Sequence, residues 1–234
     1  IPIYKRGDML ANVVSLMKNV VVAGSHGKTT TTSLISNIFL HAKIDPTVIN
    51  GGVLNSFSGS AKLGKSEWCI LESDESDGSF IKIPPTYSIV TNIDKEHMDF
   101  YKSLEEIKKN FIKFIEKTPS FGKAFICIDD NNSRNVIKKL KNLNYNTYGT
   151  SKSSNFEILN VLQKEDFSNF DIKINLPGVK NSYIKNVKIP LIGLHNIRNS
   201  TAAAAIAFSV GIPIKIIKKG LEKFSGVQRR FTKI

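Results

Sequence analysis

Residues 23–32 read Ala-Gly-Ser-His-Gly-Lys-Thr-Thr-Thr-Thr and directly follow the apolar run Val20-Val21-Val22. The apolar run predicts a buried strand, and residues 29–42 have the pattern of a helix. A strand, a glycine turn and a helix start leave backbone N–H groups pointing outward at the positive end of a helix, so this order predicts a phosphate-binding loop, or P-loop. Lys28 would neutralise phosphate charge, and Thr29 would offer its hydroxyl to Mg²⁺. The strict spacing Gly-x-x-x-x-Gly-Lys-Thr requires glycine at position 22, where this chain has valine, so the loop is a variant.

The composition is that of a globular protein. With 234 residues and 41% hydrophobic content, one large domain, or one domain with a small appendage, can bury a core. No apolar run is long enough to span a bilayer, and residues 1–19 lack the charged start and apolar centre of a signal peptide. Cys69 and Cys127 lie in apolar, strand-like runs, which predicts buried thiols in a cytoplasmic protein without a disulfide. Because the chain starts at Ile1 instead of Met, we expect a piece of a longer protein.

A formal net charge of +13 raises the possibility of nucleic-acid binding. The lysines, however, come in scattered groups such as Lys138-Lys139-Lys141 and Lys215-Lys218-Lys219, without interleaved aromatic residues. This pattern favours solvated helix faces, and we expect no nucleic-acid and no membrane partner. A positive field would also attract an anionic substrate.

Strand-like and helix-like segments alternate along the chain. Continuous apolar runs predict strands buried on both faces at 20–23, 46–49, 67–72, 87–91, 123–128 and 145–148. Periodic segments predict helices at 29–42, 103–117, 131–143, 196–210 and 213–224. This order is typical of a doubly wound α/β fold with a mainly parallel sheet. Alternating residues between 156 and 192 add a small antiparallel β insertion, within about 151–192.

Carboxylates follow the predicted strand 67–72. Glu72 stands at the end of this strand, where an acidic side chain would reach the Mg²⁺ of a bound nucleotide. The acids that come next, Asp74, Glu75 and Asp77, fit a solvated acidic loop. We therefore predict Glu72 as the metal ligand of this segment.

A histidine follows the strand predicted at 87–91. His97 lies just beyond that strand, and the carboxyl ends of parallel strands meet at the edge where ligands bind in open α/β sheets. A lone histidine is usually a capping or core residue, but its place beside the ends of two other strands favours a ligand role. Histidine is an unusual ligand for Mg²⁺, which prefers oxygen.

Six motifs occur in an order that resembles the central ATPase domain of the Mur ligases. The resemblance covers nearly the whole chain and is closest to the member that adds L-alanine to UDP-N-acetylmuramate. Ser25 stands where the family usually has threonine. The motifs are Gly24-Ser25-His26-Gly27-Lys28-Thr29-Thr30-Thr31-Thr32, Asn50-Gly51-Gly52, Glu72-Ser73-Asp74-Glu75-Ser76-Asp77, Asn92-Ile93-Asp94-Lys95-Glu96-His97-Met98-Asp99, Gly193-Leu194-His195-Asn196-Ile197-Arg198-Asn199 and Gly226-Val227-Gln228-Arg229-Arg230-Phe231.

The resemblance implies roles for particular residues, with ATP and Mg²⁺ as cofactors. Thr29 would bind a first Mg²⁺, Glu72 would be a Mg²⁺ ligand, and His97 would bind a second Mg²⁺ near the acceptor carboxylate. Related ligases also carry a carbamylated lysine, which we do not assign, although Lys113 lies in the corresponding region. The implied catalytic residues are Lys28, Glu72, His97 and Arg230, and the implied nucleotide-binding residues are Gly24, Ser25, His26, Gly27, Lys28, Thr29, Thr30, Asn196, Asn199 and Arg230.

The resemblance also implies an ATP-dependent carbon–nitrogen ligase of peptidoglycan precursor synthesis. The lactyl carboxylate of UDP-N-acetylmuramate would attack the γ-phosphate, and the amine of L-alanine would displace phosphate from the acyl phosphate. Residues 1–19 would be the trailing piece of an N-terminal UDP-binding domain with its linker, and residues 20–234 the central ATP-binding domain. The C-terminal domain would be absent, so we expect the 234-residue chain to be inactive as a ligase on its own.

Two other enzyme classes and one binding class remain as alternatives. A recycling ligase would attach a preformed tripeptide to the same sugar nucleotide, and folate polyglutamate synthases are more distant. The strings Asp74-Glu75-Ser76-Asp77 and His97-Met98-Asp99 favour the alanine-adding type. The alternative of a basic, nucleotide-responsive domain that binds nucleic acid is supported by charge alone. An electrophoretic mobility shift with duplex nucleic acid would test it.

Overall fold

Strand β1 (Lys18–Ala23) lies in the interior of the sheet, which separates two hydrophobic cores. The computed structural model describes residues 3–54, 59–141, 144–179 and 182–226. Val20 and Val22 face one core, whereas Val21 and Ala23 face the other, because successive side chains of a strand point to opposite faces. These four residues are fully buried. A strand that is apolar on both faces therefore fits the centre of a sheet that is covered on both sides.

The strands of the described residues form one ten-stranded sheet in the order β10-β9-β8-β7-β6-β5-β1-β4-β2-β3. Between β8 and β2 in this order, all neighbouring strands are parallel. The outer pairs, β10 with β9, β9 with β8 and β2 with β3, are antiparallel. The strands after β1 are β2 (Thr47–Leu54), β3 (Gly59–Lys62), β4 (Trp68–Glu72), β5 (Tyr87–Val90), β6 (Lys123–Cys127), β7 (Tyr145–Gly149), β8 (Phe156–Gln163), β9 (Ser168–Ile174) and β10 (Ser182–Ile189).

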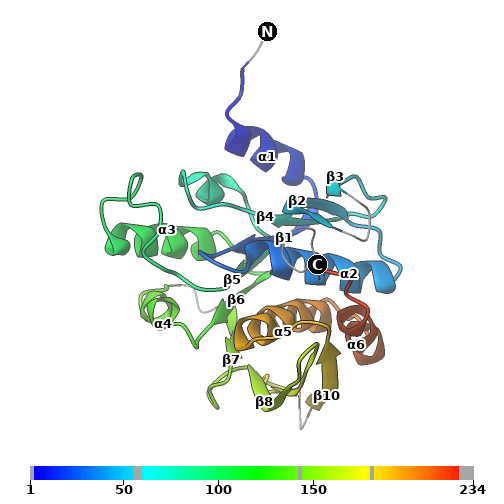
Figure 1. Cartoon of the computed structure of the whole chain (residues 1–234). Coiled ribbons are helices and arrows are strands. Elements are labelled where there is room, and N and C mark those ends of the chain that lie inside the picture. The colour runs from blue at the N-terminus through cyan, green and yellow to red at the C-terminus, as the bar shows by residue number, and fades with distance from the viewer. Residues whose placement is uncertain (1–2, 55–58, 142–143, 180–181, 227–234) are drawn as a thin grey trace.

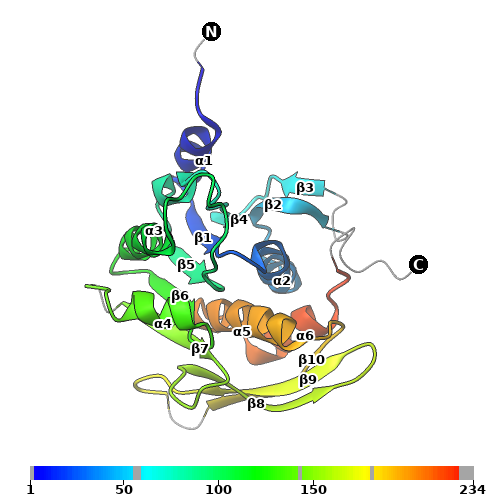
Figure 2. The same cartoon turned by 60° about the vertical axis from the view of Figure 1, so that its left-hand side comes forward.

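Helices cover both faces of the sheet (Figures 1 and 2). One core contains side chains of α2 (Lys28–His41), α5 (Leu194–Ser209) and α6 (Ile214–Glu222). The other core contains side chains of α3 (Leu104–Glu116), α4 (Asn131–Ile137) and the 3₁₀ turn η1 (Ser79–Lys82), and α1 (Arg6–Val14) contributes Val14 to it. The doubly wound α/β architecture that the sequence predicts is confirmed.

The antiparallel insertion that the sequence predicts within about 151–192 is confirmed as strands β8, β9 and β10. Strands β8, β9 and β10 continue the main sheet, because β8 pairs in parallel with β7 through Tyr148 and Phe156. In Figure 2 these three strands lie beneath α5. The insertion therefore extends the main sheet and the surface on which α5 rests.

Three other elements depart from the predicted boundaries. The helix predicted at 131–143 ends at Ile137, because the amide of Leu140 turns back to the carbonyl of Ile137 and brings Leu140 into the core. Strand β2 is longer than predicted and forms an edge hairpin with β3. Helix α1 forms within residues 1–19, for which the sequence predicted no element.

The carboxyl ends of β4, β1, β5 and β6 meet at one edge of the sheet, since these four strands are parallel. The loops that begin at residues 24, 73, 91 and 128 therefore lie at that edge. Among the described residues, no helix has the length and apolar character needed to cross a membrane.

Candidate functional site

Two glycines shape the loop between β1 and α2. Gly24 has φ +134°, and a Cβ atom there would lie 2.1 Å from Oγ1 of Thr91. Gly27, the residue before α2, has φ +86°, and its Cβ would lie 2.7 Å from Oδ1 of Asn199. Both positions need glycine, because the backbone conformation is left-handed and neighbouring side chains fill the space. The loop 24–27 is therefore packed between the segment after β5 and helix α5.

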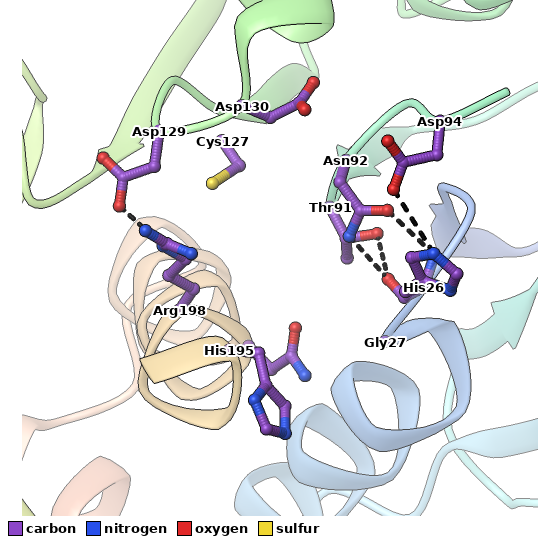
Figure 3. A pocket seen from close by; sticks show the side chains of 11 residues that line it. His26, Gly27, Thr91, Asn92, Asp94, Cys127, Asp129, Asp130, His195 and Arg198 are labelled. Carbon is purple, nitrogen blue, oxygen red and sulfur yellow. Dashed lines mark hydrogen bonds and ion pairs between the residues drawn. The ribbon is translucent and has the colours of Figure 1, made fainter. Parts of the chain in front are cut away.

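The segment after β5 holds this loop through hydrogen bonds. The main-chain N–H of His26 donates to Oδ1 of Asn92 at 2.9 Å, and Nδ2 of Asn92 donates to the carbonyl of His26, also at 2.9 Å. Oγ1 of Thr91 donates to the same carbonyl at 2.7 Å (Figure 3). The N–H of Asp94 donates to Oγ of Ser25 at 2.8 Å. The loop is thus fixed before any ligand arrives, which is the condition for preorganised binding.

Helix α2 starts at Lys28, directly after the loop. The first N–H groups of an α-helix have no acceptor within the helix, and they lie at the positive end of its dipole. Thr29 and Thr30 in this first turn are buried. A helix start of this kind is suited to an anion, and phosphate binding by the loop stays a prediction.

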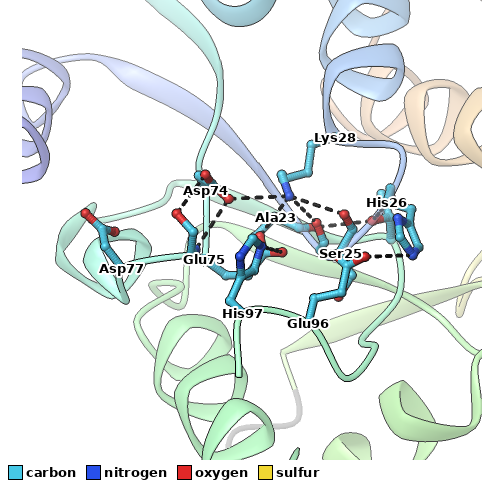
Figure 4. Close-up of polar contacts among 12 residues, drawn as sticks. Ala23, Ser25, His26, Lys28, Asp74, Glu75, Asp77, Glu96 and His97 are labelled. Carbon is cyan, nitrogen blue, oxygen red and sulfur yellow. Dashed lines mark hydrogen bonds and ion pairs between the residues drawn. The ribbon is translucent and has the colours of Figure 1, made fainter. Parts of the chain in front are cut away.

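Lys28 is held by the loop and by Glu75 (Figure 4). Its Nζ lies 2.9 Å from Oε2 of Glu75 and donates to the carbonyl of Gly24 at 2.8 Å. Oδ1 of Asp74 lies 3.6 Å from the same Nζ. The Lys28 side chain is 14% exposed, so its charge is shielded from solvent and acts on close neighbours.

Glu75 corrects the interpretation of the acidic loop. The sequence predicted Asp74, Glu75 and Asp77 as solvated, but Glu75 is 1% exposed. The main chain turns inward here, because Tyr101 donates its hydroxyl hydrogen and Gly78 its N–H to the carbonyl of Glu75. Burial raises the pKa of the Glu75 carboxyl, while the charge of Lys28 opposes this rise.

His97 lies on the other side of Glu75. Its Nε2 is 3.7 Å from Oε1 of Glu75, and its main chain is left-handed with φ +55°. Such a conformation is uncommon for a residue with a side chain and concentrates at functional sites. His97 and Lys28 therefore reach the same edge of the sheet, as the strand order predicts.

In the part of the chain that the structure describes, one group of three acidic or histidine side chains could hold a metal ion. Ligand atoms of Asp74, Glu75 and His97 all lie within 4.8 Å of one another. Oε1 of Glu75 accepts no hydrogen bond from a described residue, although it is buried. A buried carboxylate oxygen in this state suits a hard cation such as Mg²⁺.

Glu72 lies outside this group. It ends β4 opposite Val22 of β1, and a Cβ on Gly51 would lie 1.9 Å from its Oε1. Glu72 therefore packs against the neighbouring strand β2, at the same end of the sheet as the loop 24–27. Its role as a metal ligand stays a prediction.

A cavity of about 460 Å³ opens between the loop and the start of α5. Asp129 and Arg198 lie on one side of it and Thr91, Asn92 and Asp94 on the other (Figure 3). Nε of Arg198 lies 2.6 Å from Oδ2 of Asp129. The volume is in the usual range for sites of small molecules, which is about 300 to 1,000 Å³.

The two predicted asparagines of α5 have different surroundings. Asn199 faces the cavity beside Gly27. Asn196 is also buried, but its Nδ2 donates to the carbonyl of Ile192 at 2.7 Å, which holds the start of the helix. Arg230 lies outside the described residues.

Ser25 and His26 are engaged within the protein. Ser25 uses its hydroxyl oxygen to accept from Asp94, whereas the imidazole of His26 is 60% exposed. Nε2 of His26 lies 3.3 Å from a carboxylate oxygen of Asp94 and 3.4 Å from one of Glu96. Contacts of these two residues with a nucleotide stay predictions.

Several residues of the cavity were not assigned from the sequence. Asp129 and Asp130 lie two and three residues after the end of β6, so the rule that ligands bind at strand ends could have found them. His195 and Arg198 stand in the motif that supplied Asn196 and Asn199. Cys127 also lines the cavity, and burial raises the pKa of its thiol to about 11. The prediction that Cys69 and Cys127 are buried, free thiols is confirmed.

Residues 22–207 match the family model that describes the Mur ligase middle domain. A UDP-N-acetylmuramate--L-alanine ligase from Pelagibacter ubique (strain HTCC1062) is 66% identical over 234 residues, which cover 100% of this chain and 50% of that protein. The chain thus spans about half the length of this relative.

Solved structures show the same fold. A UDP-N-acetylmuramate-alanine ligase from Thermotoga maritima, MurC, matches with a TM-score of 0.80 at 26% identity, over 97% of this chain and 49% of that chain. MurF ligase from Thermotoga maritima in complex with ADP matches with a TM-score of 0.73 at 19% identity, over 97% of this chain and 54% of that chain. At 19% identity the second likeness supports the fold alone.

Proposed function

Because the chain belongs to the Mur ligase middle domain family, we propose that it is the nucleotide-binding part of an ATP-dependent ligase that joins L-alanine to UDP-N-acetylmuramate. The reaction would serve peptidoglycan precursor synthesis in the cytoplasm. The observation that carries this function is Lys28, with a side chain only 14% exposed, at the start of α2, next to a rigid glycine loop and a cavity of about 460 Å³. Sugar nucleotide and amino acid would bind mainly in the other half of a protein of the relatives' length.

The nucleotide phosphates would lie at the start of α2. Free N–H groups there and the Nζ of Lys28 would neutralise the β- and γ-phosphates, and Asn199, which lines the cavity, would contact the nucleotide. The rest of the nucleotide would extend through the cavity towards Arg198 and Asp129. Arg230, outside the described residues, would reach the phosphates from the chain that follows α6.

Mg²⁺ would neutralise oxygens of the γ-phosphate and of the acceptor carboxylate, held by the hydroxyl of Thr29, the carboxylate of Glu72 and the imidazole of His97. The residues present fit such an ion, because the ligand atoms of Asp74, Glu75 and His97 lie within 4.8 Å of one another at this edge, and the buried Oε1 of Glu75 accepts no hydrogen bond from a described residue. The protein would thus supply charge neutralisation and alignment for two anions that repel each other.

The chemistry has two steps. A carboxylate oxygen of the sugar nucleotide forms a bond to the γ-phosphorus, and the bond from that phosphorus to the bridging oxygen of ADP breaks. The deprotonated amine of L-alanine then attacks the acyl carbon, phosphate leaves, and the nitrogen loses its remaining extra proton. Lys28 would stabilise negative charge on the transferred phosphoryl group, and no residue needs to act as a covalent nucleophile.

A ligase assay on a protein of the relatives' length tests this function. It contains UDP-N-acetylmuramate, ATP and Mg²⁺ with L-alanine, glycine, L-serine or the tripeptide L-alanyl-γ-D-glutamyl-meso-diaminopimelate, and measures phosphate release and product mass. We expect L-alanine to give the highest kcat/KM. A preference for the tripeptide would assign the recycling reaction instead, and no release that depends on the sugar nucleotide would contradict the proposal.

A further inference from the structure

Lys28 already has an anionic partner in this structure. Its ammonium group has three N–H donors, and acceptors surround it at short range: Oε2 of Glu75 at 2.9 Å and the carbonyl of Gly24 at 2.8 Å, with the carbonyl of Ser25 at 3.4 Å. The two carbonyls belong to the rigid loop and stay in place. A phosphate oxygen that binds to Nζ therefore competes with the carboxylate of Glu75.

Hydrogen bonds fix the main chain of Glu75, whereas its carboxylate has a second neighbour, His97, besides Lys28. Tyr101 donates from its hydroxyl to the carbonyl of Glu75 and from its N–H, at 2.9 Å, to the carbonyl of His97. The two residues are thus held at a constant separation by one buried tyrosine. Oε1 of Glu75 accepts no hydrogen bond from a described residue and points to Nε2 of His97, 3.7 Å away (Figure 4).

We propose that Glu75 is the counter-ion of Lys28 in the nucleotide-free protein, and that a phosphate of the nucleotide displaces its carboxylate, which then faces His97. This inference rests on the proposed nucleotide-binding function. Its consequence is a cost in affinity, because a carboxylate that is 1% exposed loses its nearest cation when the phosphate binds. Glu75 is therefore a positioning residue that holds Lys28 in place and lowers the affinity for the nucleotide.

The effect of replacing Glu75 on the affinity for the nucleotide distinguishes this role from a purely structural one. If Glu75 only supported the loop, its replacement would weaken nucleotide binding. If its carboxylate competes with phosphate, Glu75→Gln keeps the size of the side chain, removes the competing charge and strengthens binding.

The test is the equilibrium binding of ATP to the 234-residue chain, by competition with a fluorescent ATP analogue in excess EDTA, so that no divalent cation contributes. We expect Glu75→Gln to lower the Kd of ATP at least threefold. Asp77→Asn is the matched control, since it removes one charge from the same loop at an exposed side chain that points away from Lys28 (Figure 4). We expect the control to stay within twofold of the unmodified chain.

An unchanged or higher Kd in a folded Glu75→Gln chain overturns the inference, and so does an equal decrease in Asp77→Asn, which would reveal an effect of net charge. If Glu75→Gln does not fold, Glu75→Asp decides: its shorter side chain weakens the contact with Lys28, so a lower Kd supports the inference and an equal or higher one overturns it. If the unmodified chain binds ATP only when Mg²⁺ is present, the same variants are compared in Mg²⁺ with the same expected results. Absence of ATP binding by the unmodified chain both in EDTA and in Mg²⁺ contradicts the proposed function itself, which keeps the two failures distinct.

Discussion

The side-chain amide of Asn92 pairs with both main-chain polar groups of His26, accepting from its N–H and donating to its carbonyl, each at 2.9 Å. Because the N–H of His26 donates to Asn92, it is not available to a bound anion. The two hydrogen bonds also fix the loop that leads to Lys28. We expect Asn92→Ala to weaken ATP binding about tenfold, because two hydrogen bonds worth about 1 kcal/mol each no longer hold the loop. Equilibrium binding of ATP measures this effect.

Asn110→Ala is a suitable control, since it removes an asparagine amide on α3 at a distance from the loop. We expect it to bind ATP as the unmodified chain does. Equal affinities of Asn92→Ala and Asn110→Ala would show that the loop holds its shape without the pair.

Gly27 and Gly211 allow a matched comparison, because both have φ +86°. A Cβ at Gly27 would meet Asn199, whereas a Cβ at Gly211 has no atom within 4 Å. Alanine at either position carries the strain of a left-handed residue, about 1 to 2 kcal/mol. We therefore expect Gly211→Ala to lower the free energy of unfolding by about that amount without changing ATP affinity.

Gly27→Ala has the same strain and also forces the loop away from α5. Its free energy of unfolding should be lower than that of Gly211→Ala, and its ATP affinity should fall more than tenfold. Denaturant unfolding and ATP titration of both variants give the comparison. Normal affinity in Gly27→Ala would mean that the close contact with Asn199 is not needed for binding.

The ion pair of Lys28 with the buried Glu75 predicts a non-additive effect on stability. Lys28→Met leaves the carboxylate of Glu75 without its nearest cation, which should lower the free energy of unfolding by roughly 2 to 4 kcal/mol at neutral pH. Adding Glu75→Gln removes the unpaired charge, so the double variant should be more stable than Lys28→Met alone. A double-mutant cycle in denaturant measures the coupling, and additive effects would contradict the ion pair.

The two buried cysteines predict how the reactivity of their thiols depends on pH. Burial raises the pKa of Cys127 to about 11 and that of Cys69 to about 12. At pH 8 the thiolate of Cys127 is then about one part in a thousand, against about a quarter for a free cysteine with a pKa of about 8.5. Iodoacetamide should therefore modify both residues slowly in the folded chain and quickly in denaturant, as mass spectrometry would record.

The raised pKa values of the two thiols also determine how the free energy of unfolding changes with pH. Between pH 8.5 and 11 the unfolded chain loses thiol protons that the folded chain keeps, so the free energy of unfolding should decrease as the pH rises. Rapid, stoichiometric modification of Cys127 in the folded chain at pH 8 would contradict this expectation.

The part of the site that depends on strand order could be predicted from the sequence. Apolar runs identify β1, β4 and β5, and parallel strands bring their carboxyl ends to one edge, which places the loop 24–27 near His97. The glycine turn before Lys28 gives the start of α2. These features are local in sequence, or follow from the rules of parallel sheets.

The inward position of Glu75 could not be predicted, because Asp74 and Asp77 beside it have the same polar character and are exposed. What buries Glu75 are contacts with Lys28 and Tyr101, which lie 47 and 26 residues away in the chain. The edge hairpin of β2 and β3 and the helix α1 also lack a strong local pattern. Their formation depends on neighbours in the fold that no short stretch of sequence specifies.

The central claim is that Lys28 and the start of α2 bind the phosphates of a nucleotide. Calorimetric titration of the 234-residue chain with Mg-ATP tests it most directly, with Lys28→Ala beside Lys109→Ala, which removes an exposed lysine of α3. We predict saturable binding at one site, at least tenfold weaker in Lys28→Ala and unchanged in Lys109→Ala, since a charge-assisted hydrogen bond contributes about 1.5 to 3 kcal/mol. No binding to the unmodified chain, or equal binding to Lys28→Ala, would contradict the account.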